Sequence, residues 1–405
     1  MSSEPEIPIR SHPDSRRFAL RLAVFYGTLF GLVGTHLPFF PVWLKAVGID
    51  ASWIGIIIAV PAVTRFTTLP FVTGLAERRQ ALRSAMIATA FLTAIGFSIV
   101  GLLHAAVAVF VAYVFTACVW TPMVPLTDGY ALKGVARYGL NYGPLRLWGS
   151  AAFIAGALVC GLLVDVIAPQ HLIWVIAAMA AIGAAAGLGL RPIETPGATP
   201  AGSAGAAGLL RKPGFLAIII ASALIQGSHA AYYAFASITW QASGFGGLTI
   251  AGLWVLGVIA EIVVFALSPR FTASPVLLVM IGASSAVVRW LVTAQEPPIA
   301  VLVVVQLMHG LTYGATLLGT MGLLVRNVPS HVAARAQGYL AACSGIVASS
   351  ASILSGVVYA QHGQGVYYVM ALMGAAGALV IGLARHRVDG LRALMDQPQS
   401  AASGG

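Results

Sequence analysis

Apolar runs almost free of charge follow one another along this chain, and each is long enough to form a helix that crosses a membrane. Only 8% of the 405 residues are charged and 59% are hydrophobic, whereas a soluble domain carries about 25% charged residues. A chain with so few charges cannot cover a surface that faces water. The sequence therefore predicts an all-α integral membrane protein.

Glycine, proline and charged residues divide the apolar runs into twelve predicted transmembrane helices. A helix needs roughly 20 mostly apolar residues to cross a bilayer. Such stretches lie at residues 18–43, 51–76, 82–103, 105–130, 144–168, 171–190, 214–240, 248–268, 273–294, 298–325, 334–361 and 364–385. Several connecting turns are very short, so successive helices are expected to be antiparallel neighbours.

The basic residues are concentrated on one side of this topology. All 22 lysines and arginines lie there except Lys45, in a loop on the other side, and Arg65 and Arg289, inside spans. The positive-inside rule makes that side the cytoplasm and places both termini in it. Lys133 and Arg137 are expected to lie in one of the cytoplasmic loops. Topology accounts for the net charge of +10, so nucleic acid is not an expected partner.

The predicted helices fall into two halves of six. A loop rich in small residues separates the halves, and Trp43 with Gly55 in the first half matches Trp240 with Gly252 in the second. Such duplication is typical of secondary transporters. We expect a cytoplasmic tail, a six-helix bundle, a central cytoplasmic loop, a second bundle pseudo-symmetric to the first, and a second cytoplasmic tail, at residues 1–17, 18–190, 191–213, 214–385 and 386–405.

Motifs of other functional classes are missing from the sequence. It has no HExxH, GxSxG or P-loop motif, and its three cysteines, Cys118, Cys160 and Cys343, lie singly within apolar runs. Residues 1–17 are polar and lack a signal-peptide cleavage site. The chain is therefore not expected to be an enzyme, or to need a metal or any cofactor besides a coupling proton. Its excess of arginine over lysine suggests a GC-rich bacterial genome and hence a multi-pass protein of the bacterial cytoplasmic membrane.

Charged residues inside the predicted helices need a reason, because a charge at mid-bilayer costs roughly 2.5–3.5 kcal/mol or more. Glu261 lies near the middle of its span without a local partner. Its carboxyl group can bind and release a proton, or it can pair with an arginine for structural reasons. Arg65 lies at a similar depth and cannot deprotonate. It is expected to face a cavity, an anion or a carboxylate, unless it snorkels to the cytoplasmic side.

Four further residues within spans are weaker candidates. Arg289 lies close to the outer end of its span, where snorkelling is easy. His309, His229 and His36 each lie in a different span, and a histidine in a helix bundle is often only a hydrogen-bonded core residue. The residues alone leave both functional and structural roles open.

Asp128 and Arg146 flank the loop between the fourth and fifth predicted helices. Hydropathy alone places them at the membrane interface, although a separation of eighteen residues also lets them face each other in a cavity. Arg146 can bind a carboxylate with two parallel hydrogen bonds. Trp148 and Phe153 follow on the same helix and offer either ring-stacking surface or ordinary packing.

Over almost its whole length the chain resembles the major facilitator superfamily. In the loop "TGLAERRQALR", the segment 75–78 matches the Leu-Ala-acid-Arg core of that superfamily's signature loop. The glycine that normally follows is replaced by Gln80, and the leading glycine is displaced to Gly74. The resemblance implies that Gly74, Glu77 and Arg78 belong to a conformational gate.

Other segments resemble the phenylpropionate-permease branch, which is related to lactose-permease-like proton symporters. They are "AYYAFASITWQASGF", "LWVLGVIAEIVVF", "AVVRWLV", "VVQLMHGLTYG" and "YGPLRLWGS". In the wider group an acid and an arginine lie eighteen residues apart, as Asp128 and Arg146 do. An arginine and a histidine lie twenty apart, as Arg289 and His309 do.

The chain departs from the sugar transporters of that group at two positions. Thr312 stands where they carry a carboxylate, and Phe153 stands where they carry a tryptophan that stacks on the sugar. Both departures argue against a sugar as the substrate.

Together these features predict proton-coupled uptake of a small organic anion by alternating access, with an aromatic carboxylate as the favoured substrate. The predicted substrate-binding residues are Arg146, Asp128, Arg65, Arg289, Trp148 and Phe153. The predicted proton-coupling residues are Glu261, Asp128 and His309. The expected partners are the solute, protons and membrane lipid, with the protein working as a monomer.

Two other functions stay open at this point. One is proton-coupled efflux of hydrophobic drugs or metabolites, because an apolar cavity would serve export as well as import. The other is uptake of a nucleoside or a sugar. Arginines outnumber Glu261 within the spans, which favours an anion over a cationic drug.

Overall fold

The computed structural model describes residues 13–193, 206–329 and 332–389, and within these ranges every regular element is a helix. The first half contains α1 (Pro13–Ala46), α2 (Ala51–Phe66), α3 (Thr68–Arg78), α4 (Leu82–Gly101), α5 (Ala106–Trp120), α6 (Met123–Tyr138), α7 (Tyr142–Val164), η1 (Pro169–His171) and α8 (Leu172–Leu188).

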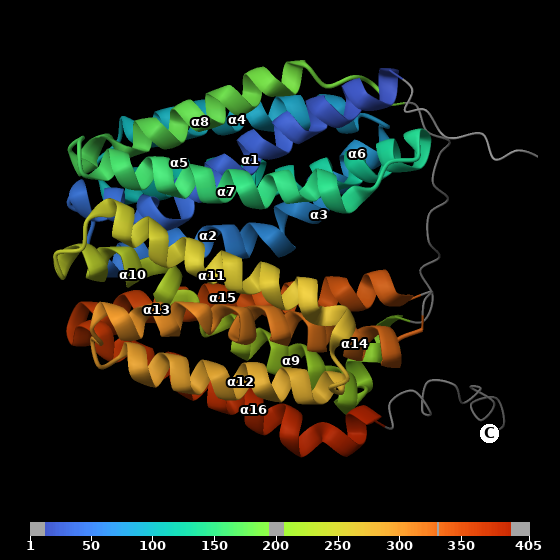
Figure 1. Ribbon diagram of the computed structural model, residues 1–405, viewed down its shortest axis with the longest axis vertical. Helices are drawn as coiled ribbons and strands as arrows, with labels where there is room; N and C mark the ends of the chain where they lie inside the picture. Colours follow the sequence, from blue (N-terminus) through green and yellow to red (C-terminus); the bar gives the residue numbers. More distant parts are fainter. Residues whose placement is uncertain (1–12, 194–205, 330–331, 390–405) are drawn as a thin grey trace, which may run out of the picture.

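The second half repeats this all-helical organisation. It contains η2 (Ala206–Arg211), α9 (Pro213–Gly227), α10 (Ala230–Ala242), α11 (Gly247–Leu267), η3 (Ser268–Arg270), α12 (Pro275–Thr293), α13 (Ile299–Leu307), the π-helix η4 (Gly310–Ala315), α14 (Thr316–Asn327), α15 (Ala333–His362), η6 (Gly363–Gly365) and α16 (Val366–Asp389). In Figure 1 the helices of the two halves form two layers that run side by side, and the start of α1 and the end of α16 lie at the same end of the molecule.

Eleven stretches of the described chain are long and apolar enough to cross a membrane. The last of them, Arg335–Val388, contains both α15 and α16 on either side of the turn η6, where Gly363 has φ +52°. Each of these two helices exceeds the roughly 20 residues that one crossing requires. The total of twelve crossings and the cytoplasmic position of both termini stay predictions.

The prediction that Lys133 and Arg137 lie in a loop was wrong. Both lie on α6, which continues to Tyr138, and only residues 139–141 connect it to α7. The helix continues because its apolar face does: Tyr130 and Gly134 are buried and pack against Phe18 of α1. The helix ends at Gly139, which adopts the left-handed conformation with φ +63°.

The two halves touch where α2 packs against α15 and α7 packs against α11. Glycines make both approaches possible. A Cβ atom on Gly55 would lie 2.8 Å from Cα of Gly356, and one on Gly161 would lie 2.6 Å from the carbonyl oxygen of Gly247. All four glycines lie within the first or last two turns of their helices, so the halves meet closely at one end.

A carboxylate strengthens that junction. Both oxygens of Asp165, the residue that follows α7, accept the backbone N–H of Gly247 at 2.8 and 3.0 Å. Gly247 is the first residue of α11, so an acid of one half caps a helix of the other. Ser352 similarly donates to the carbonyl oxygen of Gly55 across the α2–α15 contact, at 2.9 Å.

Candidate functional site

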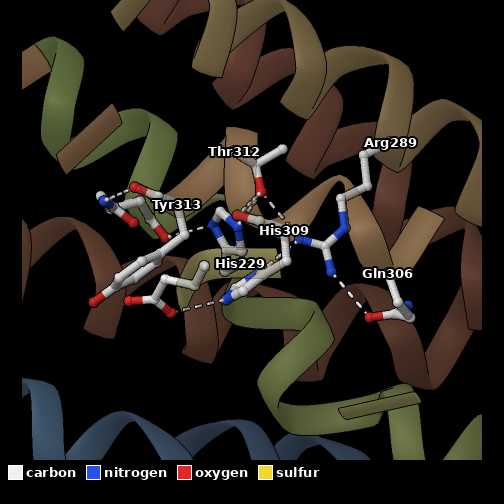
Figure 2. A network of polar contacts seen from close by, with 8 residues as sticks. His229, Arg289, Gln306, His309, Thr312 and Tyr313 are labelled. Carbon is white, nitrogen blue, oxygen red and sulfur yellow. Dashed lines mark hydrogen bonds and ion pairs between the residues drawn. The ribbon is translucent and has the colours of Figure 1, made fainter. Parts of the chain in front are cut away.

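A buried arginine organises a polar network in the second half. The Arg289 side chain, on α12, is 0% exposed. Its Nη1 lies 2.9 Å from Nδ1 of His309 and donates to the hydroxyl of Thr312 at 3.0 Å, while its Nη2 donates to Oε1 of Gln306 at 3.1 Å. Figure 2 shows the guanidinium pointing toward these three side chains. No carboxylate contacts it directly among the described residues.

The contact with Arg289 fixes the proton position on His309. A guanidinium only donates hydrogen bonds, so Nδ1 of His309 must be the acceptor. The neutral imidazole then carries its hydrogen on Nε2, which lies 4.0 Å from Oε2 of Glu261 on α11. His309 therefore connects the buried cation to the carboxylate, with a donor facing Glu261.

The same reasoning assigns the second histidine of the network. Nδ1 of His229 lies 3.3 and 3.1 Å from the carbonyl oxygens of Ile225 and Gln226, which only accept, so Nδ1 carries the hydrogen. Its Nε2 then accepts from the hydroxyl of Thr312 at 3.0 Å. Thr312 thus accepts a hydrogen bond from Arg289 and donates one to His229. Neither His229 nor His309 can therefore bind a second proton without losing one of these hydrogen bonds.

The π-helix and two glycines bring these residues together. Thr312 lies inside η4, and His309 immediately precedes it. A Cβ atom on Gly310 would lie 2.6 Å from the carbonyl oxygen of Ala260, and one on Gly257 would touch the His309 ring at 3.4 Å. Glycine at both positions therefore lets α11, which carries Glu261, pack closely against η4. A π-helical turn inside a helix is often found at a functional site.

Aromatic rings cover the buried cation. The guanidinium carbon of Arg289 lies 4.9 Å from the ring centre of Tyr232 and 4.6 Å from that of Trp290. Tyr232 in turn packs against Trp254 at 4.5 Å. Contact with ring faces favours a cation where water is excluded, which helps the second half to hold Arg289 without a direct acid partner.

The first half contains a more open cluster around Asp128, on α6. Its Oδ1 accepts hydrogen bonds from the phenols of Tyr26 at 2.6 Å and Tyr142 at 2.9 Å. Nε of Arg146 lies 3.8 Å from the same oxygen, and both side chains are about one-third exposed, at 34% for Arg146 and 32% for Asp128. The two phenols therefore satisfy this oxygen of Asp128, and Arg146 adds only a longer ionic contact.

Arg146 is held in place by a ring rather than by acceptors. Its guanidinium carbon lies 4.1 Å from the ring centre of Phe30. Gly149 leaves room for this stacking, since a Cβ atom there would lie 2.8 Å from the Phe30 ring and 2.9 Å from Nη1 of Arg146. Within the described residues the two terminal nitrogens have no hydrogen-bond acceptor. They can therefore bind a carboxylate in the bidentate geometry that suits a guanidinium.

The two clusters face each other across the boundary between the halves. The positive charge of Arg146 interacts electrostatically with the carboxyl group of Glu261. The helices that carry these two residues, α7 and α11, pack together. Phe153 of α7 and Val255 of α11 belong to one small apolar cluster at that boundary. Because Phe153 lies seven residues after Arg146, it is on the same face of α7, two turns away.

The structure does not bring Trp148 and Arg65 into either cluster. Trp148 lies two residues from Arg146, which turns it to a different face of α7, and it is 60% exposed. Arg65, at the end of α2, is exposed, and its charge acts on Tyr313 of η4. The side chain of Phe153, by contrast, is only 7% exposed.

The predicted gate residues lie on α3 and at its end. Glu77 and Arg78 are exposed, and a Cβ atom on Gly74 would meet nothing within 4 Å. Gln80, at the position where the superfamily normally has glycine, adopts φ +49°. The backbone conformation that favours glycine in this loop therefore occurs at Gln80, whereas neither crowding nor a positive φ requires glycine at Gly74.

His36 lies in a separate aromatic environment in the first half. It is 4% exposed, with its Nε2 3.0 Å from the hydroxyl of Tyr113. Its ring packs against Phe40 at 4.6 Å and Trp120 at 4.4 Å, and its Nδ1 has no partner among the described residues. No charged side chain takes part in these contacts.

Sequence reasoning missed Tyr26, Tyr142 and Gln306. A helical repeat would have indicated two of them, because Tyr142 precedes Arg146 by four residues and Gln306 precedes His309 by three, so each pair shares a helix face. Tyr26 comes from α1, 102 residues away from Asp128, and no spacing predicts that contact. Among the described residues no group of three or more His, Cys, Asp or Glu side chains is arranged to hold a metal ion.

The sequence is similar to those of known membrane transporters. A family model described as "MFS_1 like family" matches residues 19–370. The chain is 33% identical over 364 residues to the probable 3-phenylpropionic acid transporter of Escherichia coli (strain K12), covering 87% of this chain and 94% of that protein. It is 26% identical over 368 residues to the maltose permease of Geobacillus stearothermophilus, covering 88% and 92%.

Solved structures share the fold at low sequence identity. The nucleoside transporter NupG superposes with a TM-score of 0.79 at 18% identity, covering 90% of this chain and 98% of that one. A bacterial homolog of the human lysosomal transporter Spinster, in an inward-facing and unoccupied conformation, gives a TM-score of 0.72 at 11% identity, covering 94% and 99%.

Proposed function

Because this chain belongs to the MFS_1 like family of the major facilitator superfamily, we propose that it is a proton-coupled symporter that takes up a small organic anion. The favoured substrate is an aromatic carboxylate such as a phenylpropionate. The similarity to the probable 3-phenylpropionic acid transporter of Escherichia coli, which extends over 94% of that protein, supports this substrate class.

The balance of charge in the two clusters carries the proposal. The two facing clusters contain two cations, Arg146 and Arg289, and two carboxylates, Asp128 and Glu261. When Glu261 takes up a proton, the site gains a net positive charge in a medium where uncompensated charge is costly. A carboxylate substrate restores neutrality. Proton and monoanion therefore favour each other's binding, and their joint transport is electroneutral.

Arg146 is the residue that we assign to the substrate carboxylate. Its terminal N–H groups are free among the described residues and its side chain is partly exposed, whereas each terminal nitrogen of Arg289 already donates to a side chain inside the protein. Asp128 keeps its own charge satisfied through Tyr26 and Tyr142, so it leaves Arg146 available. Phe153 and its apolar neighbours two turns away would contact the ring of the substrate.

Glu261 is the residue that we assign to the proton. His309 accepts from Arg289 through Nδ1, so its single hydrogen points toward the Glu261 carboxylate 4.0 Å away, and His309 is not the carrier of the coupling proton. Arg289 acts through His309 and is a positioning residue.

Alternating access requires one end of the two halves to open as the other closes. The glycine contacts and the Asp165–Gly247 hydrogen bonds close one end. The side chains of Arg146, Asp128 and Glu261 remain partly exposed. With the predicted topology the closed end is the outer one, so this conformation faces the cytoplasm.

The decisive experiment measures accumulation of 3-phenylpropionate in proteoliposomes under an inward proton gradient. Wild-type protein is expected to accumulate the acid, and collapse of the gradient is expected to abolish accumulation. Glu261→Gln should lower gradient-driven accumulation by about 100-fold or more while exchange of labelled for unlabelled substrate continues, because exchange needs no net proton release. Glu296→Gln, which changes an exposed carboxylate outside the site, is the matched control.

The same vesicles separate the alternative functions. Failure of the wild type to accumulate any aromatic acid would reject the proposed substrate class, and competition by maltose or nucleosides would point to the uptake alternative. Loss of preloaded drug or metabolite under a gradient that is acidic outside would point to efflux. Normal gradient-driven uptake by Glu261→Gln would reject Glu261 as the coupling group.

A further inference from the structure

An apolar cavity lies in the second half, and none of its lining residues belongs to the two polar clusters. Its volume is about 330 Å³, and its wall is apolar apart from Thr272 and one arginine, with Val264, Leu278, Ile281, Leu311, Ala315 and Arg270 among the lining residues. Val264 comes from α11, Leu278 and Ile281 from α12, and Leu311 and Ala315 from η4. In Figure 1 the ribbon of α13, η4 and α14 passes between α11 and α12, and both of these helices pack against η4. The π-helix therefore forms the floor of a groove between α11 and α12.

This groove opens from within the membrane-spanning part of the protein. Its two walls belong to the spans Gly247–Arg270 and Pro275–Thr293. Ile281 is 36% exposed and Leu311 is 39% exposed, so the lining is accessible from the lipid side. An apolar groove at this depth gains dispersion contacts only if hydrocarbon fills it.

Arg270 gives the groove a polar end. It is the last residue of its span and of η3, which is where lipid headgroups begin. Within the described residues it has neither an ion pair nor a hydrogen bond through its side chain. An arginine presents a planar fork of donors that matches a phosphate group.

We propose that this groove binds one acyl chain of an anionic phospholipid, with the phosphate of its headgroup held by Arg270. The apolar length of the groove selects a hydrocarbon chain, and the single unpaired cation at its end selects a negative headgroup. A small soluble anion would use Arg270 but would leave the apolar part unfilled. The lipid chain would pack against Leu311, the neighbour of Thr312, so the bound lipid would contact the π-helix that carries part of the polar network. The inference does not depend on which solute the protein carries.

The test compares lipid retention by the full-length protein in native mass spectrometry after incubation with dioleoyl phosphatidylglycerol or dioleoyl phosphatidylethanolamine. Wild-type protein is expected to retain phosphatidylglycerol in preference. Arg270→Gln should reduce that preference by about fivefold, the effect of one basic residue near an anionic headgroup. Leu278→Trp, which fills the groove but keeps the arginine, should reduce retention of both lipids.

Arg385→Gln is the matched control, because Arg385 is an exposed arginine near the end of α16 and does not line this groove. It should leave the preference unchanged. Ala273→Trp, in the loop at the mouth of the groove, replaces Leu278→Trp if the latter unfolds, as judged by its thermal transition. Unchanged preference in Arg270→Gln, an equal loss in Arg385→Gln, or full retention in the groove-filling variants would each overturn the proposal.

Discussion

The two halves hold their arginines in opposite ways. Arg289 is 0% exposed, donates to three side chains and contacts the rings of Tyr232 and Trp290. Arg146 is one-third exposed, contacts its acid only at 3.8 Å and keeps its terminal donors free. An arginine whose two terminal nitrogens already donate to side chains inside the protein organises the site, whereas an arginine with free terminal donors can bind a ligand. Depth in the membrane alone does not distinguish these roles.

The largest expected effect is on the free energy of unfolding, and it tests the role of the buried arginine, Arg289. Arg289→Met removes the donors to His309 and Gln306 and leaves these acceptors unsatisfied in a buried site. Each such loss costs about 1–3 kcal/mol, so we expect the free energy of unfolding to fall by about 3 kcal/mol or more. Arg146→Met should change it by less than about 1 kcal/mol, as is usual for a partly exposed group. Denaturant unfolding in detergent measures both, and equal effects would contradict the division of roles.

The next largest effect is on substrate affinity, and it tests the role of the partly exposed arginine, Arg146. Arg146→Lys keeps the positive charge but loses the two parallel hydrogen bonds to a carboxylate. A hydrogen bond to a charged group contributes about 1.5–3 kcal/mol, so the KM for 3-phenylpropionate should rise about 10- to 100-fold, with little change in thermal stability. Uptake kinetics in proteoliposomes measure the KM. An unchanged KM would mean that the carboxylate binds elsewhere, and Arg65 would be the next candidate.

The sequence predicted the all-helical architecture because that architecture depends on local hydropathy. The duplication into two six-helix bundles stays a prediction. The sequence also identified Asp128 with Arg146 and Arg289 with His309, which lie 3.8 and 2.9 Å apart, but only through spacings shared with a family. The sequence did not predict that the Arg289 side chain would be fully buried. That burial depends on aromatic rings from α10 and α12 and on hydrogen-bond acceptors from α13 and η4.

The expectation for Trp148 shows a different kind of error. The sequence places Trp148 on the same helix as Arg146, but a step of two residues turns a side chain by roughly 200° around a helix. The helical repeat alone was sufficient to separate them. Tyr26 is the opposite case, since its contact with Asp128 depends on the packing of α1 against α6.

A smaller effect concerns the junction where the halves meet. Asp165→Asn removes the negative charge at the N-terminus of α11, and such a charge contributes about 0.3–1 kcal/mol. We expect a shift of about two- to fivefold toward the conformation in which this end is open. Spin labels at Gln170→Cys and Glu296→Cys, in a background without the native cysteines, should report a larger population at long distance.

Asp50→Asn is the matched control for the junction. Asp50 also caps a helix, accepting from the backbone of Ser52 at 2.9 Å and Trp53 at 3.1 Å, but that helix belongs to its own half. Its substitution should leave the distance distribution unchanged. If both variants shift the distances equally, capping stabilises the helices without holding the halves together.

The smallest effect tests a difference between the halves outside the site. The loop after α3 turns through Gln80, which adopts φ +49° and donates its N–H to the carbonyl oxygen of Glu77 at 3.0 Å. The corresponding turn of the second half passes through Phe271 at φ −77° and needs no left-handed residue. A side chain in the left-handed region costs roughly 1 kcal/mol that glycine avoids. Gln80→Gly should therefore raise the free energy of unfolding by up to about 1 kcal/mol, whereas Arg79→Gly, at φ −87°, should lower it by about 0.5–1 kcal/mol. Thermal unfolding of the two variants checks the sign, and a loss of stability in both would show that the loop of the first half is not strained at Gln80.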